Sequence, residues 1–274
     1  VNEKINELFF GDRVKLRKSF HTIFTSATLT NLASEDLTKA YSYFIQNTMF
    51  PINDSILSEV KYSPFAYDKH AKFFYTDDIT SPSKDRGKFI DESIDLVKKI
   101  LDISQGKALI LFTSKADMNA VYTRLKALNL NYTLIKQNEI SSQQQLIHKF
   151  KQDVNSVLLG TGVFWEGISI EGIALSNLII YKLPFPLPEP IINEKCKRSK
   201  NPLEEVLVPE MIIKLKQGVG RLIRNKTDKG IVSIIDSRLG DKSKASYKEK
   251  VWQALPIKQR TNSLKELQSF YDNL

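Results

Sequence analysis

The chain has 274 residues, 42% of them hydrophobic and 26% charged, which is typical of a folded globular protein and excludes wholesale disorder. At roughly 150 residues per domain, this length predicts one large or two small domains. One cysteine, Cys196, and three histidines exclude an internal disulfide and any multi-cysteine metal site, so we expect no metal centre. No stretch is apolar enough for a membrane span and no signal peptide opens the chain, so we expect a cytoplasmic protein that binds no membrane.

The net charge is +9, and its excess is concentrated in one region. Residues 190–260 contain seventeen Lys and Arg against eight Asp and Glu, whereas the rest of the chain is neutral. A locally basic region is typical of proteins that bind nucleic acid or phosphate-bearing ligands, although lysines that only solubilise helix faces would give the same count. The candidates for nucleic-acid contact are Lys195, Lys197, Arg198 and Lys200.

The chain begins with a stretch of helical periodicity, residues 1–10, that starts at a valine. We therefore expect this chain to be a fragment of a larger protein. Residues 31–86 are long and irregular, with one expected helix at 34–46. Residues 183–190 (LPFPLPEP) predict an extended connector, because four prolines remove the backbone donors that a helix or central strand needs.

Short apolar runs of strand length predict buried β-strands, because they are apolar on both faces. In chain order they are residues 21–26, 108–113, 156–160, 178–183 and 231–236, with a weaker candidate at 132–135. Stretches of helical period lie at residues 91–103, 116–128, 141–150 and 209–222. This alternation predicts an α/β fold with a mostly parallel sheet covered by helices on both faces. Ligands of such sheets bind where the strands end.

Two of the loops that follow expected strands contain residues suited to anions. Residues 25–29 (TSATL) offer small hydroxyl side chains, although a helix N-cap uses the same residue types. Residues 160–167 (GTGVFWEG) form a glycine-rich turn whose backbone amides could approach an anion, with Thr161 as a hydroxyl donor. Trp165 could stack a base, but a core tryptophan is the commoner case. The turn is not the G-x-G-x-x-G fingerprint, which disfavours a dinucleotide-binding oxidoreductase, and no Walker loop occurs in the chain.

Residues 217–224 (QGVGRLIR) give the sharpest signal. On a helix, Gln217, Arg221 and Arg224 would share one face and form a donor set suited to phosphate oxygens, with Leu222 and Ile223 in the core. The glycines at 218 and 220 each cost about 1 kcal/mol in a helix relative to alanine. We therefore expect another lobe or a ligand to approach closely there.

Together these segments resemble the superfamily-two helicases. Residues 217–224 resemble motif VI of that superfamily, residues 25–29 motif III, and residues 160–172 motif V. The runs FWEG at 164–167, LPFP at 183–186 and SPF at 63–65 narrow the resemblance to the DinG branch, which is related to the XPD helicases. The segments occur in the family's order and cover almost the whole chain.

The resemblance implies a RecA-like lobe of the P-loop NTPase type. The family's Walker A and DEAH motifs lie on the first of two lobes, and this chain contains neither. Residues 1–30 would then be the end of lobe one, including its motif III strand, and residues 31–274 would be lobe two with insertions at 31–86 and 183–208. The protein would be a carboxy-terminal motor lobe that is incomplete and inactive without lobe one, with lobe one in the same polypeptide.

The family's functional residues can be carried over position by position. Arg221 and Arg224 would be catalytic, contacting the γ-phosphate of an ATP–Mg²⁺ complex that lobe one binds. ATP contacts would come from Gln217, Gly220, Glu166, Gly167 and Ser169. Contacts to single-stranded DNA, or to DNA with a single-stranded overhang, would come from Thr113, Ser114, Gly160, Thr161 and Gly162. Ser26 and Thr28 would couple the nucleotide state to strand movement, and the implied biological process is DNA repair.

One position departs from the family pattern. The family usually has an aspartate where Ser169 stands, so ATP affinity or turnover could be weakened here. Some family members hold an iron–sulfur cluster on lobe one, and some Gram-positive members have a DEDD exonuclease domain ahead of the helicase region. The main hypothesis is therefore the second lobe of an ATP-dependent DNA helicase. The alternative is a nucleic-acid-binding or regulatory lobe of a DinG-type exonuclease with impaired helicase activity.

Overall fold

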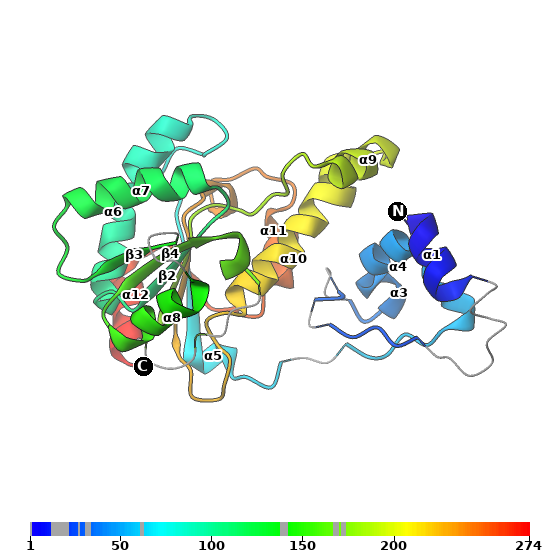
Figure 1. Ribbon diagram of the computed structural model, residues 1–274, viewed down its shortest axis with the longest axis horizontal. Coiled ribbons are helices and arrows are strands. Elements are labelled where there is room, and N and C mark those ends of the chain that lie inside the picture. Colours follow the sequence, from blue (N-terminus) through cyan, green and yellow to red (C-terminus); the bar gives the residue numbers. More distant parts are fainter. Residues whose placement is uncertain are drawn as a thin grey trace. The chain divides into compact units, whose positions relative to one another are not determined.

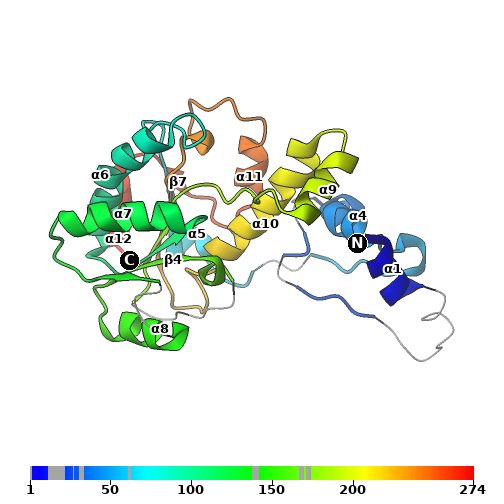
Figure 2. The ribbon, with the colours of Figure 1, turned by 45° about the horizontal axis from the view of Figure 1, so that its top comes forward.

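The computed structural model describes residues 2–11, 22–26, 28–30, 34–60, 63–137, 142–166, 170 and 174–274 (Figures 1 and 2). The chain divides into two compact units. The first comprises residues 1–63 and 185–213, and the second comprises residues 64–184 and 214–274. These two units are not the two helicase lobes predicted at residues 1–30 and 31–274, and that assignment to lobes stays a prediction.

The second unit contains, in its described residues, a parallel sheet of seven strands in the order β3-β4-β2-β5-β6-β1-β7. The strands are β1 Ala71–Tyr75, β2 Ala108–Phe112, β3 Leu134–Lys136, β4 Val157–Thr161, β5 Asn177–Ile180, β6 Gly230–Ile234 and β7 Arg260–Thr261. The central strands are fully buried, as expected for a sheet with helices on both faces. The predicted α/β fold with a parallel sheet is confirmed.

Successive residues of each strand face opposite sides of the sheet, and the helices follow this alternation. Ile110 and Phe112 of β2 belong to the core cluster beneath α6 and α7. Leu111 points to the other face, where the carboxyl-terminal part of α10 packs, and Phe73 of β1 meets Trp252 of α11 with ring centroids 5.6 Å apart. Figure 1 shows α6, α7 and α12 on one side of the sheet and α10 and α11 on the other.

The longer helices of the second unit, α6, α7, α8 and α12, begin at side-chain caps that the sequence supplies. Ser114 Oγ accepts a hydrogen bond from the backbone N–H of Asp117 at 3.1 Å, and Asp85 caps α6 in the same way. The helices of this unit are α5 Tyr67–His70, α6 Arg86–Ser104, α7 Lys115–Ala127, α8 Gln143–Gln152, α11 Lys248–Ala254, α12 Leu264–Asp272 and the short η2 Gly162–Phe164 and η4 Ser237–Leu239. The capped starts place the first turns of α6 and α7 beside the ends of the strands.

The first unit is helical and is held together by aromatic side chains. Its helices are α1 Asn2–Phe10, α3 Leu37–Ala40, α4 Ser42–Thr48, α9 Pro190–Arg198, the first part of α10 Val208–Val219, and the short η1 Ile52–Asp54 and η3 Leu203–Leu207. Phe24 contacts Phe10, Phe44 and Phe50 with ring centroids 5.4–6.3 Å apart. A second cluster joins Tyr43 and Lys195 to Glu210, with Lys195 Nζ 2.7 Å from the carboxylate.

Some predicted elements differ from those observed. The strand predicted at 21–26 is wrong for residues 22–26, which are not in a strand, because no described strand lies beside them to complete the hydrogen-bond ladder. The helix predicted at 34–46 is interrupted at Tyr41, between α3 and α4. The segment 31–86, predicted to be irregular, contains β1, and the extended connector predicted at 183–190 is confirmed up to residue 189.

Candidate functional site

The loops that follow the strands gather at one edge of the sheet, because the strands are parallel. Polar residues within two positions of the strand ends include Thr113 and Ser114 after β2, Gln137 after β3, Lys182 after β5 and Asp236 after β6, with Thr161 as the last residue of β4. Most of the residues predicted for nucleic-acid contact therefore lie together at this edge.

The glycine-rich turn after β4 is held in one conformation by its neighbours. A Cβ at Gly160 would lie 2.5 Å from Cγ of Phe164, so no larger residue fits beneath that ring. Gly162 has φ +51°, in the left-handed region that favours glycine, and a Cβ at that position would have no atom within 4 Å. The two glycines are thus explained by the turn itself, and the space beside Gly162 is open.

Thr161 is buried between these glycines and bonds to a residue that the sequence did not single out. Its backbone N–H donates to Oε1 of Gln137 at 2.6 Å, and its hydroxyl Oγ1 lies 3.0 Å from the same oxygen. Gln137 follows the weakest of the predicted strands, so the signal that could have found it is a polar residue at the end of a strand. The Thr161 donors that were predicted to hold a phosphate are bound to this amide.

Trp165 joins the turn after β4 to the end of α10. Its side chain is fully buried, and its indole N–H donates to the carbonyl of Phe112 at 2.8 Å. A Cβ at Gly218 would lie 2.8 Å from Cζ3 of the same ring. The core interpretation of Trp165 is therefore confirmed. The expectation that a ligand or another lobe requires the glycine at 218 is wrong, because the indole of Trp165 fills that place.

Arg221 is oriented by the backbone of the same tryptophan. Its Nε and Nη2 donate to the carbonyl oxygen of Trp165 at 3.1 and 2.9 Å. Burial and the nearby charge of Arg224 lower the pKa of Arg221, and Glu166 opposes this change. The guanidinium of Arg221 is thereby held against the turn that contains Trp165.

The prediction that Gln217, Arg221 and Arg224 share one helical face is wrong. The helix α10 ends at Val219, and both arginines lie in the turn and loop that follow. The backbone N–H of Arg224 donates to Oδ2 of Asp228 at 2.9 Å, a bond that stabilises the loop in place of helical hydrogen bonds. The predicted burial of Leu222 and Ile223 is confirmed. Gly220, a poor helix residue, directly follows the end of α10, and Asp228 also accepts from the N–H of Asn225 at 3.0 Å.

The remaining residues predicted to contact ATP lie around the same turn. Gln217 is half-buried in the last turn of α10, and Gly220 follows that helix with its N–H bonded to the carbonyl of Lys216 at 3.0 Å. Glu166 is exposed directly after Trp165. Gly167 and Ser169 lie outside the described residues, so the departure from the family pattern at position 169 has no structural description.

A buried carboxylate near Thr113 and Ser114 was not identified from the sequence. Asp117, in the first turn of α7, is 2% exposed and pairs with Nε of Arg86 at 2.7 Å and with Nζ of Lys182 at 2.5 Å. Burial favours a higher pKa for Asp117, but the hydrogen bonds from Lys182, with those of Ser114 and Arg86, outweigh it and lower the pKa. Asp117 therefore ties the starts of α6 and α7 to the loop after β5.

The two residues predicted to couple nucleotide state to movement belong to the first unit. The hydroxyls of Ser26 and Thr28 are 3.3 Å apart, and the backbone N–H of Thr28 donates to the Ser26 hydroxyl at 3.2 Å. This is a local turn stabilised by a serine side chain. The described residues predicted to contact ATP, and those predicted to contact nucleic acid after β2 and β4, lie in the second unit.

The basic residues predicted for nucleic-acid contact divide into two kinds. Lys195 is half-buried in its ion pair with Glu210 and lies over the ring of Tyr43, with Nζ 5.4 Å from the centroid, so it packs within the first unit. Arg198 forms an exposed pair with Glu194 at 2.9 Å, and Lys197 and Lys200 are exposed. Lys197, Arg198 and Lys200 are therefore exposed enough for a polyanion to reach them, whereas Lys195 is not.

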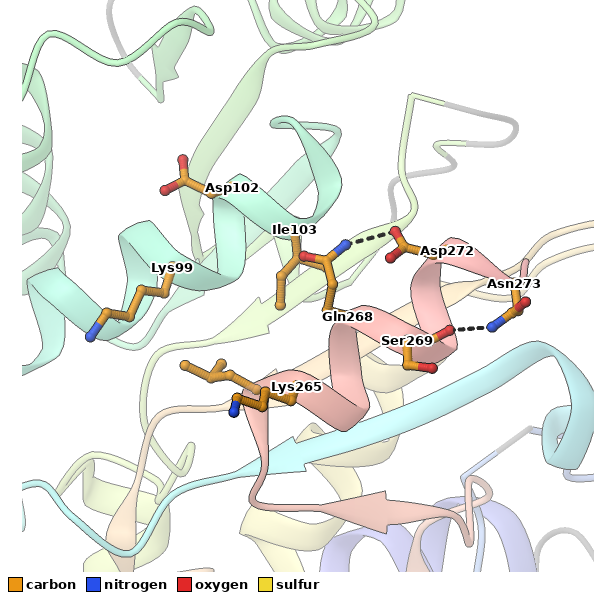
Figure 3. A pocket seen from close by; sticks show the side chains of 9 residues that line it. Lys99, Asp102, Ile103, Lys265, Gln268, Ser269, Asp272 and Asn273 are labelled. Atoms are coloured by element: carbon orange, nitrogen blue, oxygen red, sulfur yellow. Dashed lines mark hydrogen bonds between the residues drawn. The ribbon is translucent and has the colours of Figure 1, made fainter.

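One pocket of the second unit lies apart from this site. Figure 3 shows it between α6 and α12, where Ile103 of one helix lies beside Gln268 of the other, and Lys99, Asp102 and Lys265 also line it. It shares no residue with the loops described above.

Within the described ranges there is no group of three or more His, Cys, Asp or Glu residues that could hold a metal ion, and no helix there is long and apolar enough to cross a membrane.

Comparison with known proteins identifies relatives of this architecture. Residues 97–258 match a family model described as Helicase C-terminal domain. The chain is 32% identical over 271 residues to the ATP-dependent DNA helicase YoaA of Haemophilus influenzae, in a match that covers 96% of this chain and 39% of that protein. It is 33% identical over 216 residues to the 3'-5' exonuclease DinG of Bacillus subtilis, in a match that covers 75% of this chain and 22% of that protein.

Solved structures share the fold at lower identity. An XPD helicase structure matches 70% of this chain and 35% of its own with a TM-score of 0.54 and 22% identity. A structure of S. cerevisiae Dbp5 bound to RNA and ADP BeF3 matches 99% of this chain and 61% of its own with a TM-score of 0.53 and 14% identity. The chain spans about two fifths or less of the lengths of the two curated relatives named above. The chain therefore belongs to the helicase C-terminal domain family, and its fold is the RecA-like fold that the solved helicase structures share.

Proposed function

We propose that this chain is the second motor lobe of an ATP-dependent DNA helicase or translocase, and that it is incomplete without a first lobe in the same polypeptide. The observation that carries the proposal is that Trp165 connects the turn after β4 to Arg221 and to the end of α10. Its carbonyl orients Arg221, its ring packs against Gly218, and its indole is bonded to β2. A loop that ends a strand is thereby coupled to a pair of arginines.

The arginines would act on ATP bound by the other lobe. Arg221 and Arg224 would contact the γ-phosphate and stabilise the charge that develops during phosphoryl transfer, an effect worth roughly 10³–10⁵ in rate. A guanidinium that is already oriented by a carbonyl needs little reorganisation when that charge appears. Further nucleotide contacts would come from Gln217, Gly220, Glu166, Gly167 and Ser169, and Mg²⁺ would be held mainly by the other lobe.

The edge of the sheet would hold DNA. Thr113, Ser114 and the turn formed by Gly160, Thr161 and Gly162 would contact the phosphates of a single strand or a single-stranded overhang. Such contacts position a strand without reading its sequence, so little sequence preference is expected. Ser26 and Thr28 would couple the nucleotide state to strand movement. The cellular role that we propose is DNA repair in the cytoplasm, and action on DNA is supported by a relative named as a DNA helicase.

The test replaces the arginines in the full-length protein. We expect Arg221→Ala and Arg224→Ala each to lower DNA-stimulated ATP hydrolysis by roughly 10³-fold or more, with little change in single-stranded DNA affinity. The control is Arg124→Ala, because Arg124 of α7 forms an exposed pair with Asp91 of α6, outside the predicted site residues, and its loss should leave full activity. The 274-residue chain alone should hydrolyse no ATP. Retention of hydrolysis within about 10-fold in both arginine variants contradicts the motor assignment.

A second candidate function is favoured by the relative named 3'-5' exonuclease DinG, since this chain covers part of that protein. Here the lobe would bind or regulate nucleic acid for an exonuclease whose helicase activity is impaired. The same arginine variants distinguish the two functions. In a regulatory lobe the double replacement leaves DNA degradation and its response to ATP unchanged, whereas in a motor lobe the response to ATP is lost.

A further inference from the structure

The side chain of Gln137 stands where a phosphate oxygen would stand in the proposed DNA site. Its Oε1 accepts hydrogen bonds from both the backbone N–H and the hydroxyl of Thr161, at 2.6 and 3.0 Å. Because an N–H group only donates, the Gln137 atom that faces it is the carbonyl oxygen of the amide. One oxygen bridging a backbone amide and a neighbouring hydroxyl is also how a glycine-rich turn holds an anion.

These two donors cannot serve Gln137 and a phosphate together. The backbone N–H and the hydroxyl of Thr161 have one hydrogen each, and Thr161 is only 6% exposed beneath the amide. A DNA strand whose phosphate accepts hydrogen bonds from Thr161 must therefore first displace the side chain of Gln137 from these donors. We propose that Gln137 closes the phosphate site at Thr161 when no nucleic acid is bound, and that a DNA phosphate binds by displacing it. This inference rests on the proposed function, in which Thr161 contacts the DNA backbone.

The two partners differ in their freedom to move. The turn around Thr161 is fixed by Phe164 packed on Gly160. Gln137 follows β3, a strand of three residues at the edge of the sheet, and its own N–H remains bonded to the carbonyl of Leu159 at 2.9 Å. Its half-buried side chain can rotate on two methylene groups while that backbone bond persists. We therefore expect the side-chain amide of Gln137, and not the turn around Thr161, to move when a phosphate binds.

A displaceable acceptor suits a lobe that must repeatedly bind and release a strand. When the phosphate leaves, the amide of Gln137 returns to both donors, so neither is left buried without an acceptor. The cost of releasing DNA is lowered, and so is the affinity for DNA. Gln137 is therefore a residue that tunes strand affinity by competing with phosphate, and it makes no contact with DNA itself.

The test measures binding of a fluorescein-labelled oligothymidylate to the 274-residue chain by fluorescence anisotropy at low salt. We expect Gln137→Ala to tighten binding by about 5- to 30-fold, the factor that corresponds to losing one or two competing hydrogen bonds. Gln137→Glu has nearly the same shape and should weaken binding by roughly 10-fold or more, because its carboxylate holds both donors and repels phosphate. Gln144→Ala, an exposed glutamine of α8, is the matched control and should leave binding unchanged.

The direction of these changes separates competition from simple support of the turn. If Gln137 only supports the turn, Gln137→Ala removes the acceptor of both Thr161 donors and weakens binding; that result overturns the inference. The variant Thr161→Val tests the DNA site separately. Weaker binding by Thr161→Val without tightening by Gln137→Ala leaves the DNA site standing and removes the inference. Unchanged binding in both variants, or no binding by any variant, overturns the inference and the DNA site together.

Discussion

The packing of Gly218 against Trp165 gives a quantitative prediction for the change Gly218→Ala. A Cβ at this position would lie 2.8 Å from Cζ3, 2.9 Å from Cε3 and 3.4 Å from Cδ1 of Leu111. The indole cannot move away easily, because it is fully buried and its N–H is bonded to the carbonyl of Phe112 at 2.8 Å. The added methyl group must therefore displace either the ring or α10.

Two opposing effects set the size of the change in the free energy of unfolding. Overpacking a well-filled core costs about 1–3 kcal/mol, and a ring that cannot yield places this site in the upper half of that range. Alanine is better than glycine in a helix by about 1 kcal/mol, which offsets part of the cost. We expect a net destabilisation of about 1–2 kcal/mol. For a domain of this size, that lowers the melting temperature by roughly 2–8 °C.

The assay compares thermal unfolding of Gly218→Ala with Gly220→Ala, its neighbour in the chain. At Gly220 the nearest atom to a Cβ is the Lys216 carbonyl oxygen at 3.3 Å, so alanine there should change stability by no more than about 0.5 kcal/mol. A double-mutant cycle with Trp165→Phe isolates the contact, since a shorter ring leaves room for the methyl group. In that background the cost of Gly218→Ala should fall by about 1 kcal/mol or more.

Two outcomes refute this reasoning. One is a Gly218→Ala variant as stable as the parent chain, which would mean that the ring and helix separate without cost. The other is an equal cost of Gly218→Ala with tryptophan and with phenylalanine at position 165, which would place the strain somewhere else.

Two further predictions concern charged groups. Asp117→Ala should destabilise the chain by about 1–3 kcal/mol, less than for a fully buried pair because Arg86 is half-exposed. The pKa of Asp117 is lowered in the folded chain, so the stability that its carboxylate contributes is present above the ordinary pKa and is lost as the pH falls through the lowered value. The unfolding free energies of Asp117→Asn and the parent chain, measured by denaturant titration, should therefore converge in acid. A constant difference at all pH values contradicts this prediction. Lys195→Ala should lower the unfolding free energy by about 1 kcal/mol and leave the salt dependence of DNA binding unchanged. Lys197→Ala should instead reduce the slope of log affinity against log salt concentration by up to about 1 without changing stability. The reverse pattern would show that Lys195 faces the nucleic acid.

Hydrophobic periodicity predicted most of the second unit. The strands β2, β4, β5 and β6 are each buried on both faces, and a run of apolar residues of strand length is a local signal for such strands. The strands β1 and β7 were missed. β7 has two residues, which is too short for any periodicity, and both strands are defined by pairing with distant partners.

The same distinction applies to the candidate site. The glycines and hydroxyls of the turn after β4 were visible in the sequence, because such residues directly after a strand indicate an anion site. Gln137 was not, because its role depends on β3 lying beside β4 and thereby bringing the amide to Thr161. The geometry of Arg221 was misjudged because helical spacing was extended beyond Val219, where α10 ends and the chain enters a loop that is bonded to Asp228.

The sequence by itself determined the fold class, the positions of most of the main strands along the chain and the family, since each depends on residue patterns along a short stretch of chain. Tertiary structure alone decided what each glycine accommodates, where α10 ends, and which donors are bound to which acceptors. Those properties depend on contacts between residues far apart in the chain: Trp165 with Gly218 and Arg221, and Gln137 with Thr161. Such contacts follow from the packing of whole elements, which no local pattern of residues encodes.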